Sequence, residues 1–241
     1  WGGDAEGGVS AANRGAERSP SDYYPTPAWC VRRLLERVPF PGGRWLEPSA
    51  GDGAIVRAVN STRPDVEWTA VELRVECVDA LTDAIAHSAG PGRIQIGDFV
   101  RDVSDGYGEL RRFDVAILNP PFSLALDFVQ RCLAVAGWVA VLQRLHWPVP
   151  AVRSGWFRAH CPDVYALPDR PSFTGTGGTD MTEYAWFVWP AGAHDRAVGS
   201  FSLLDATPAT ERKADPRQAA LFAEHCAGAR TQTQLLDGGS R

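Results

Sequence analysis

The clearest indication of the fold of this chain is the sequence Leu46-Glu47-Pro48-Ser49-Ala50-Gly51-Asp52-Gly53. It lies between an expected strand at residues 44–47 and an expected helix at residues 54–60. Glycines let the backbone turn sharply and approach a ligand closely, beyond the carboxyl ends of the strands where open α/β sheets bind ligands. A pyrophosphate site would favour GxGxxG, whereas this loop has AGDG with the carboxylates Glu47 and Asp52. The loop therefore favours a cofactor with a positively charged methionyl group, with an ordinary strand–helix turn as the alternative.

Strand-like and helix-like stretches alternate on both sides of this loop. Some have apolar residues at helical spacing, and others are short apolar or β-branched runs. This alternation is typical of an α/β fold, in which helices cover a mostly parallel sheet. The expected helices are residues 27–38, 54–60, 75–87, 124–136 and 152–161, and the expected strands are 44–47, 66–72, 94–96, 113–118, 138–142, 164–167 and 184–189.

Acidic residues stand at the ends of two further expected strands. Glu72 is placed to bind both hydroxyls of a ribose. Asp98 is placed to accept a hydrogen bond from an adenine amino group, while Phe99 packs on the ring. A single acid after a strand is more often a helix cap or a solvated turn, but acids at three successive strand ends are harder to explain in this way. The expected cofactor pocket comprises Glu47, Ser49, Gly51, Asp52, Gly53, Glu72, Leu73, Asp98 and Phe99.

The sequence Asn119-Pro120-Pro121-Phe122 directly follows the apolar strand at residues 113–118. The exocyclic amine of adenine is a poor nucleophile because its lone pair is delocalised into the ring. An Asn side-chain carbonyl and a Pro backbone carbonyl can each accept one N–H of that amine and aim its lone pair at a methyl donor. The prolines stiffen the backbone, and Phe122 offers an aromatic face to an extruded base. These four residues are the expected catalytic group, with a proline-stopped strand end and a buried Phe as the alternative.

These motifs, in this order, resemble those of the gamma-class amino-methyltransferases that act on DNA adenine, including small enzymes of phages and prophages. The resemblance begins at Tyr24-Pro25-Thr26-Pro27 and extends over roughly residues 22–190. It implies a class I methyltransferase fold, Rossmann-like, with a seven-stranded, mostly parallel sheet, one antiparallel strand near its edge and helices on both faces. It also implies S-adenosylmethionine as cofactor, with Tyr24 and Thr26 at its methionyl end and Asn119 beside it. Phe173 would be a second aromatic wall for the base.

Larger members of that family carry a separate target-recognition domain, and little chain follows residue 189 here to form one. The candidates for a DNA-contacting surface are residues 144–158 and 174–180. The first segment includes Arg144, His146, Trp147, Arg153 and Trp156. The alternative is that the two tryptophans are core residues and that His146 and His160 are ordinary surface histidines.

Composition adds constraints without deciding the function. The chain has 241 residues, 44% of them hydrophobic, and a net charge of −5 that argues weakly against nucleic-acid binding. The five cysteines form no CxxC pair, so we expect neither disulfides nor a metal site. No apolar run is long enough to span a membrane and no signal peptide is recognisable, which indicates a cytoplasmic protein. We expect a disordered segment at residues 1–20, a catalytic domain at 21–195 and a partly disordered tail at 196–241, with a short helix near 216–225.

The same motifs leave two alternatives to a DNA acceptor. The acceptor amine can belong to adenine in RNA or to a protein glutamine, since both are planar amino groups. The chain can also be an inactive, cofactor-binding partner subunit, although an inactive copy has no need to keep Asn119–Phe122.

Overall fold

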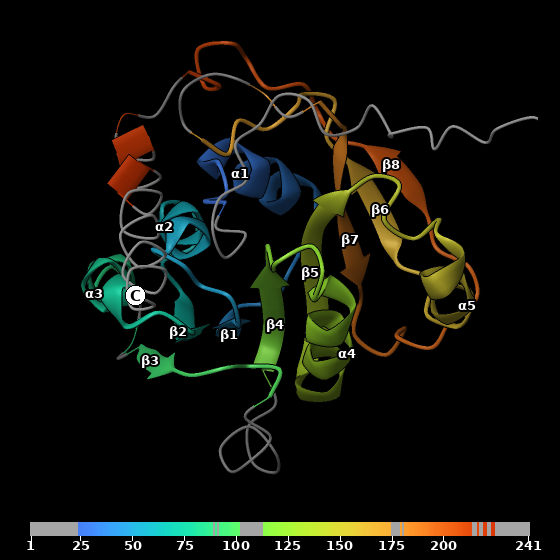
Figure 1. Cartoon of the computed structure of the whole chain (residues 1–241), viewed down its shortest axis with the longest axis horizontal. Coiled ribbons are helices and arrows are strands. Elements are labelled where there is room, and N and C mark those ends of the chain that lie inside the picture. Colours follow the sequence, from blue (N-terminus) through green and yellow to red (C-terminus); the bar gives the residue numbers. More distant parts are fainter. Residues whose placement is uncertain are drawn as a thin grey trace, which may run out of the picture.

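A single sheet of eight strands organises the protein. The computed structural model describes residues 24–88, 90, 92–101, 113–174, 179 and 181–213, together with 216, 219, 220, 223 and 224. The strand order is β3-β2-β1-β4-β5-β7-β6-β8, with helices packed on both faces (Figure 1). The predicted α/β fold with a mostly parallel sheet is confirmed, but the predicted number of seven strands is wrong.

The first five strands run parallel to one another. They are β1 (Gly43–Glu47), β2 (Val66–Glu72), β3 (Arg93–Ile96), β4 (Phe113–Leu118) and β5 (Ala136–Arg144). Strand β1 pairs with β2 on one side and with β4 on the other, so the strand order reverses beside β1. A reversal of this kind opens a crevice at the carboxyl ends of the strands, where open α/β sheets bind ligands.

The other three strands complete the sheet beyond β5. Strand β7 (Tyr184–Trp189) is antiparallel to both β5 and β6 (Asp163–Ala166). The additional strand, β8 (Phe201–Leu203), is parallel to β6. The Asp163 carboxylate accepts hydrogen bonds from the backbone N and the Oγ of Ser200, both at 2.7 Å, which fixes the chain at the start of β8. The sheet therefore continues past residue 195, where the sequence placed the end of the catalytic domain.

The helices divide between the two faces of the sheet. Helices α1 (Ala28–Arg37), α2 (Ala54–Asn60) and α3 (Val78–Ile85) pack on one face around Trp45 and Trp68. Helices α4 (Ala125–Val135) and α5 (Ala151–Ala159) pack on the other, around Val139 and Phe187. The helix expected at residues 75–87 is shorter, because its first turn is a separate 3-10 helix, η3 (Val75–Cys77). The predictions for residues 1–20 and most of those for 174–180 and 216–225 lie outside the described residues.

Candidate active site

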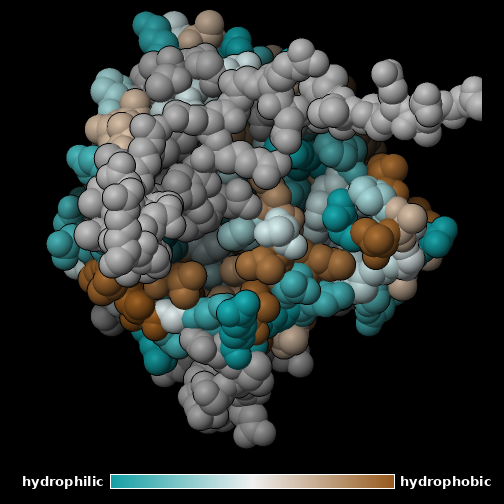
Figure 2. Space-filling model, viewed as in Figure 1, coloured by the Kyte–Doolittle hydropathy of each residue, from teal (hydrophilic) through white to brown (hydrophobic). Residues whose placement is uncertain are grey.

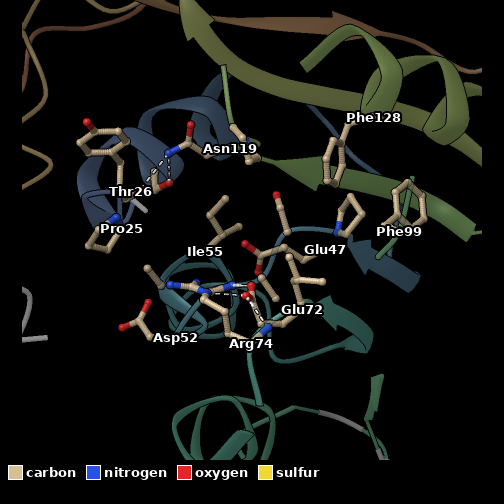
Figure 3. A pocket seen from close by; sticks show the side chains of 18 of the residues that line it. Pro25, Thr26, Glu47, Asp52, Ile55, Glu72, Arg74, Phe99, Asn119 and Phe128 are labelled. Atoms are coloured by element: carbon tan, nitrogen blue, oxygen red, sulfur yellow. Dashed lines mark hydrogen bonds and ion pairs between the residues drawn. The ribbon is translucent and has the colours of Figure 1, made fainter. Parts of the chain in front are cut away.

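A pocket lies at the carboxyl ends of β1, β2, β3 and β4, where the strand order reverses. Figure 3 shows Glu47 and Glu72 directed into this space from two strand ends, whereas the side chain of Asn119, which follows β4 and also lines the pocket, points toward Thr26. Every predicted cofactor residue except Gly53 lines the pocket. The lining residues are Tyr24, Pro25, Thr26, Glu47, Pro48, Ser49, Ala50, Gly51, Asp52, Ala54, Ile55, Glu72, Leu73, Arg74, Gly97, Asp98, Phe99, Asn119, Pro121, Leu124 and Phe128.

The glycine loop turns sharply from β1 into α2. Gly51 has φ of 55° and Gly53 has φ of 84°, in the left-handed region that side chains disfavour. A Cβ on Gly53 would lie 2.7 Å from the Cβ of Ala84, so this glycine also allows α2 to pack against α3. Gly53 therefore lies on the side of the loop that faces α3 and not the pocket. Gly51 lines the pocket and donates its backbone N–H to Glu72 Oε2 at 2.7 Å.

Glu47 is a buried carboxyl group at the base of the pocket. It is only 2% exposed, and its Oε2 has no hydrogen-bond partner. Burial raises the pKa of Glu47 well above its ordinary value, and the nearby carboxylates of Asp52 and Glu72 act in the same direction against the opposing charge of Arg57. Ser49 Oγ is likewise buried without a partner. Val56 donates a backbone hydrogen bond to the Glu47 carboxyl group, so one carboxyl oxygen and the Ser49 hydroxyl remain for a ligand that brings a positive charge and hydrogen-bond donors.

Two of the three other predicted acids, Glu72 and Asp52, have charged partners within the protein. Glu72 accepts hydrogen bonds from Arg74 through its backbone N at 3.1 Å and its Nε at 2.6 Å, besides the one from Gly51. Asp52 pairs with Arg57 on α2. Arg74 was not predicted, because an Arg after a strand is an ordinary surface residue until the fold places it over an acid. Each carboxylate oxygen can accept more than one hydrogen bond, so Glu72 can still bind ligand hydroxyls.

Asp98 and Phe99 form the far wall of the pocket. Asp98 Oδ1 accepts backbone hydrogen bonds from Val100 at 2.9 Å and Arg101 at 3.0 Å, so this acid also stabilises the local turn. The solvated-turn alternative therefore describes part of its role. Phe99 is 2% exposed and stacks on Phe128 of α4 at 5.7 Å between ring centroids, which leaves an apolar wall for a flat ring.

Asn119 is held by the N-terminal segment of the described chain. Its Nδ2 donates to the backbone carbonyl of Tyr24 at 3.0 Å and to Thr26 Oγ1 at 3.1 Å (Figure 3). A backbone carbonyl only accepts hydrogen bonds, so the atom that faces Tyr24 must be the nitrogen. Both amide hydrogens are thereby engaged, and the side-chain carbonyl oxygen of Asn119 can still accept a hydrogen bond.

An aromatic cluster lies beside Asn119. Phe122 stacks on Tyr24 at 5.9 Å, with an angle of 21° between the rings, and the guanidinium of Arg144 lies 4.7 Å from its centroid. Phe173 contacts Tyr24 at 6.0 Å and Tyr184 at 5.0 Å. The fold thus brings the predicted substrate residues Phe122, Arg144 and Phe173 together. Tyr184 was missed, because it belongs to an entirely apolar strand.

The other predicted substrate residues do not join this cluster. Trp147 is 4% exposed and packs in the core against Phe157 at 4.8 Å and Phe187 at 5.4 Å. The prediction that Trp147 belongs to a DNA-contacting surface is therefore wrong, and Trp147 is a core residue. His146 is exposed. Trp156 stacks on His160 at 4.6 Å, on the α5 side of the sheet.

Three further properties of the described residues concern metals, membranes and thiols. In that part of the chain, no cluster of His, Cys, Asp and Glu has the arrangement of a metal site. None of the helices described there has the length and apolar character needed to cross a membrane. The four cysteines within it, Cys30, Cys77, Cys132 and Cys161, are free thiols.

The chain matches no protein-family model and no curated protein sequence. Solved structures do share its fold. The methyltransferase subunit of a type I restriction-modification system from Streptococcus thermophilus superimposes with a TM-score of 0.57 at 14% identity, over 90% of this chain. This chain spans only 55% of that subunit.

Two further structures resemble the chain over most of their own length. A Pyrococcus horikoshii protein provisionally identified as an RNA methyltransferase gives a TM-score of 0.52 at 18% identity, over 71% of this chain and 87% of that one. A Listeria monocytogenes protein provisionally identified as a class I S-adenosylmethionine-dependent methyltransferase gives a TM-score of 0.52 at 12% identity, over 82% of this chain and 67% of that one. At these identities the likeness shows the fold alone, which is that of the class I S-adenosylmethionine-dependent methyltransferases.

Proposed function

We propose that this protein transfers a methyl group from S-adenosylmethionine to the N6 amino group of adenine in DNA. The observation that carries the proposal is the environment of Asn119. Its amide nitrogen is engaged by Tyr24 and Thr26, and its carbonyl can accept a hydrogen bond beside a pocket lined by acids, a glycine loop and an apolar wall. Preorganised acceptors of this kind promote reaction of an amine by fixing its direction.

The pocket residues fit this cofactor by their chemistry. When bound, S-adenosylmethionine supplies a methyl group on a positively charged sulfur. Glu47 and Ser49 offer unpaired buried oxygens to its charged and hydrogen-bonding methionyl end. Glu72 accepts hydrogen bonds from ribose hydroxyls, and the apolar wall of Phe99 and Leu124 packs on a purine.

The second acceptor for the target amine is the Pro120 carbonyl. Of the two proline carbonyls, that of Pro121 accepts the backbone N–H of Leu124 at 3.0 Å and is used by the turn into α4. Pro120 O makes no such backbone hydrogen bond among those of the described residues. Asn119 and Pro120 therefore accept one N–H each, which leaves the nitrogen lone pair directed away from both.

Phe122, which is partly exposed, binds the target base by its ring, and the buried Phe173 supports the neighbouring Tyr24. Both phenylalanines belong to the aromatic cluster beside Asn119, and stacking on aromatic side chains is the usual way to hold an extruded base. Three features favour adenine in DNA. They are the complete Asn119–Phe122 sequence, the preceding Tyr24–Pro27 segment and the order in which the motifs follow one another.

The test is a labelling experiment with purified protein. The protein is incubated with methyl-labelled S-adenosylmethionine and unmethylated genomic DNA, RNA or glutamine-containing protein in parallel, and the digested products are separated. Label in N6-methyladenine from DNA supports the proposal. Label in RNA or protein alone would mean that RNA or protein, and not DNA, is the acceptor. Tight cofactor binding without transfer to any acceptor would favour an inactive partner subunit.

A further inference from the structure

Gln143 is a polar residue buried in the middle of the fold. It is 2% exposed and follows an apolar run on β5 whose residues are packed in the core. Its Nε2 donates to the backbone carbonyl of Pro120 at 3.5 Å. A buried amide without partners costs about 1–3 kcal/mol, so a polar side chain at this position needs a specific contact.

The contact falls on the carbonyl that the proposed reaction needs. Strands β4 and β5 pair in register up to Leu118 and Val141, so Pro120 lies beside Gln143 when that register is continued by two residues. Pro120 lies two residues beyond the end of β4, and its carbonyl accepts no backbone hydrogen bond among those of the described residues. Backbone pairing therefore does not orient the Pro120 carbonyl, whereas Gln143 reaches it from the neighbouring strand.

The next residue of β5 supports the same loop. Successive side chains of a strand point to opposite faces of the sheet, so Gln143 and Arg144 leave β5 on opposite sides. Gln143 contacts Pro120, and the Arg144 guanidinium lies over the ring of Phe122. The end of β5 thus contacts both halves of the Asn119–Phe122 segment.

We propose that Gln143 is a positioning residue that aims the Pro120 carbonyl at the target amine. A carbonyl oxygen has two lone pairs, so the one that accepts from Gln143 leaves the other for the substrate N–H. Gln143 acts through Pro120 and contacts neither cofactor nor base. This inference rests on the proposed function, because it assigns Pro120 as an acceptor for the amine.

The kinetic test compares three variants with the wild type. Gln143→Met keeps the length and loses the donor, and we expect kcat to fall roughly 3- to 10-fold while the Kd for S-adenosylmethionine, measured by calorimetry, is unchanged. Val141→Ala is the matched control, since Val141 is fully buried on the same face of the same strand. It should lower thermal stability and leave kcat unchanged.

The third variant, Gln143→Glu, separates positioning from packing. A protonated carboxyl can donate to Pro120 O, whereas a carboxylate repels it, and burial raises the pKa of such a group. Its kcat relative to the wild type should therefore rise as the pH is lowered. A flat ratio, or full activity in Gln143→Met, would overturn the proposal.

A spectroscopic measurement tests the contact without catalysis. The step from Pro120 to Pro121 is the only Pro–Pro step in the sequence. Labelling all prolines with ¹³C at the carbonyl and with ¹⁵N therefore makes Pro120 the only proline carbonyl bonded to a labelled proline nitrogen, and its resonance can be selected.

That resonance should move upfield in Gln143→Met and stay in place in Val141→Ala. An unmoved resonance in Gln143→Met would show that Gln143 does not hold Pro120, even if the wild type methylates DNA. If the wild type instead transfers no methyl group to adenine, the proposed function fails, and the carbonyl shift alone decides whether Gln143 orients Pro120.

Discussion

The position of Asn119 in the pocket and its hydrogen bonds predict how its substitution affects turnover. Its side chain lines the pocket, but its hydrogen bonds go to Tyr24 and Thr26. Because the proposed contact of its carbonyl is with the acceptor amine, Asn119→Ala should reduce kcat by about 10²–10³-fold, the usual loss for one preorganised electrostatic group, and should affect the cofactor affinity far less. Steady-state kinetics and calorimetry on the same preparation measure both quantities. Loss of cofactor binding with normal turnover at saturation would remove Asn119 from the acceptor role.

Glu47 predicts a pH dependence of cofactor binding. Burial raises the pKa of its carboxyl group, and Asp52 and Glu72 add to the shift. A cationic ligand binds the ionised form, so binding should release a proton and the affinity should rise with pH until Glu47 is ionised in the free protein. Calorimetry in buffers with different ionisation enthalpies measures the released proton. Glu47→Gln should abolish the release, and an unchanged release in that variant would assign the proton to another group.

The same carboxyl group affects the stability of the ligand-free protein in the opposite sense. Its pKa is higher in the folded than in the unfolded chain, so its stabilising contribution is complete below the unfolded pKa of about 4.3 and is lost as the pH rises through the folded pKa. Ligand-free Glu47→Gln should therefore unfold at a higher temperature than the wild type at neutral pH, with the difference vanishing below about pH 4. A wild type that remains the more stable at neutral pH would contradict the burial of an unpaired acid.

Residue roles were predictable from sequence where they depend on local order along the chain. Glu47, Glu72 and Asn119 each follow a strand directly, and the sheet brings strand ends together. Roles that depend on distant neighbours were not predictable. Nothing near Gln143 in sequence points to Pro120, and Trp147 resembles a surface residue until Phe157 and Phe187 pack around it.

At the level of elements, the strands with clear ends were predicted to the residue. Residues 66–72, 113–118 and 184–189 match β2, β4 and β7, because each is a run of apolar and β-branched residues. Strand β8 was missed for a physical reason. It has only three residues, two of which are exposed, so its stability comes from pairing with β6 and from the Asp163 contacts to Ser200.

The segment after β8 packs against the body of the protein. Leu204 and Thr207 are buried, and the Thr207 backbone N–H donates to Asp169 Oδ2 at 2.7 Å. Arg212 pairs with Asp169 at 3.2 Å, and Glu211 with Arg33 of α1 at 3.3 Å. These contacts tie residues 204–212 to the segment after β6 and to α1, and α1 directly follows the segment that holds Asn119.

Asp169→Ala should consequently destabilise the fold. It leaves the buried N–H of Thr207 without an acceptor, which costs about 1–3 kcal/mol. Urea unfolding measures the change in the free energy of unfolding. Asp195→Ala is the matched control, because Asp195 pairs with His160 at 3.2 Å but its side chain is 87% exposed, so the expected change is within about 0.5 kcal/mol. Equal effects of the two substitutions would contradict a structural role for residues 204–212.

At the scale of the whole molecule, the sequence predicted the class of architecture better than its arrangement in space. The alternation of elements indicated a parallel sheet, and the resemblance implied an antiparallel strand, which is β7. The division of the core into two layers, and which aromatic residues face the pocket, depends on how each helix packs and is not encoded in local periodicity.

In the view of Figure 2, hydrophobic residues also form a band across the middle of the surface, and the exposed fractions of Leu73 and Leu124 at the pocket are 66% and 42%.

The pocket joins both core layers, so a bound ligand should stabilise the entire fold. Ala50 and Ile55 belong to the layer of α1 to α3, whereas Phe99 and Phe128 belong to the layer of α4 and α5, and all four line the pocket. Unfolding of either layer therefore releases the ligand. S-adenosylmethionine at 100 times its Kd should stabilise the protein by about 2.7 kcal/mol and raise Tm by roughly 5–10 °C.

The control ligand for this measurement is NAD, which carries a pyrophosphate. The acids Asp52 and Glu72 line the pocket without a glycine-rich GxGxxG turn, so the pocket should not bind a pyrophosphate and NAD should leave Tm unchanged. Differential scanning calorimetry with each ligand gives the comparison, and Glu72→Ala should lose most of the shift with S-adenosylmethionine because its ribose contacts are removed. A larger shift with NAD would mean that this pocket is a dinucleotide site, and the negative charge at the strand ends would then need a different explanation.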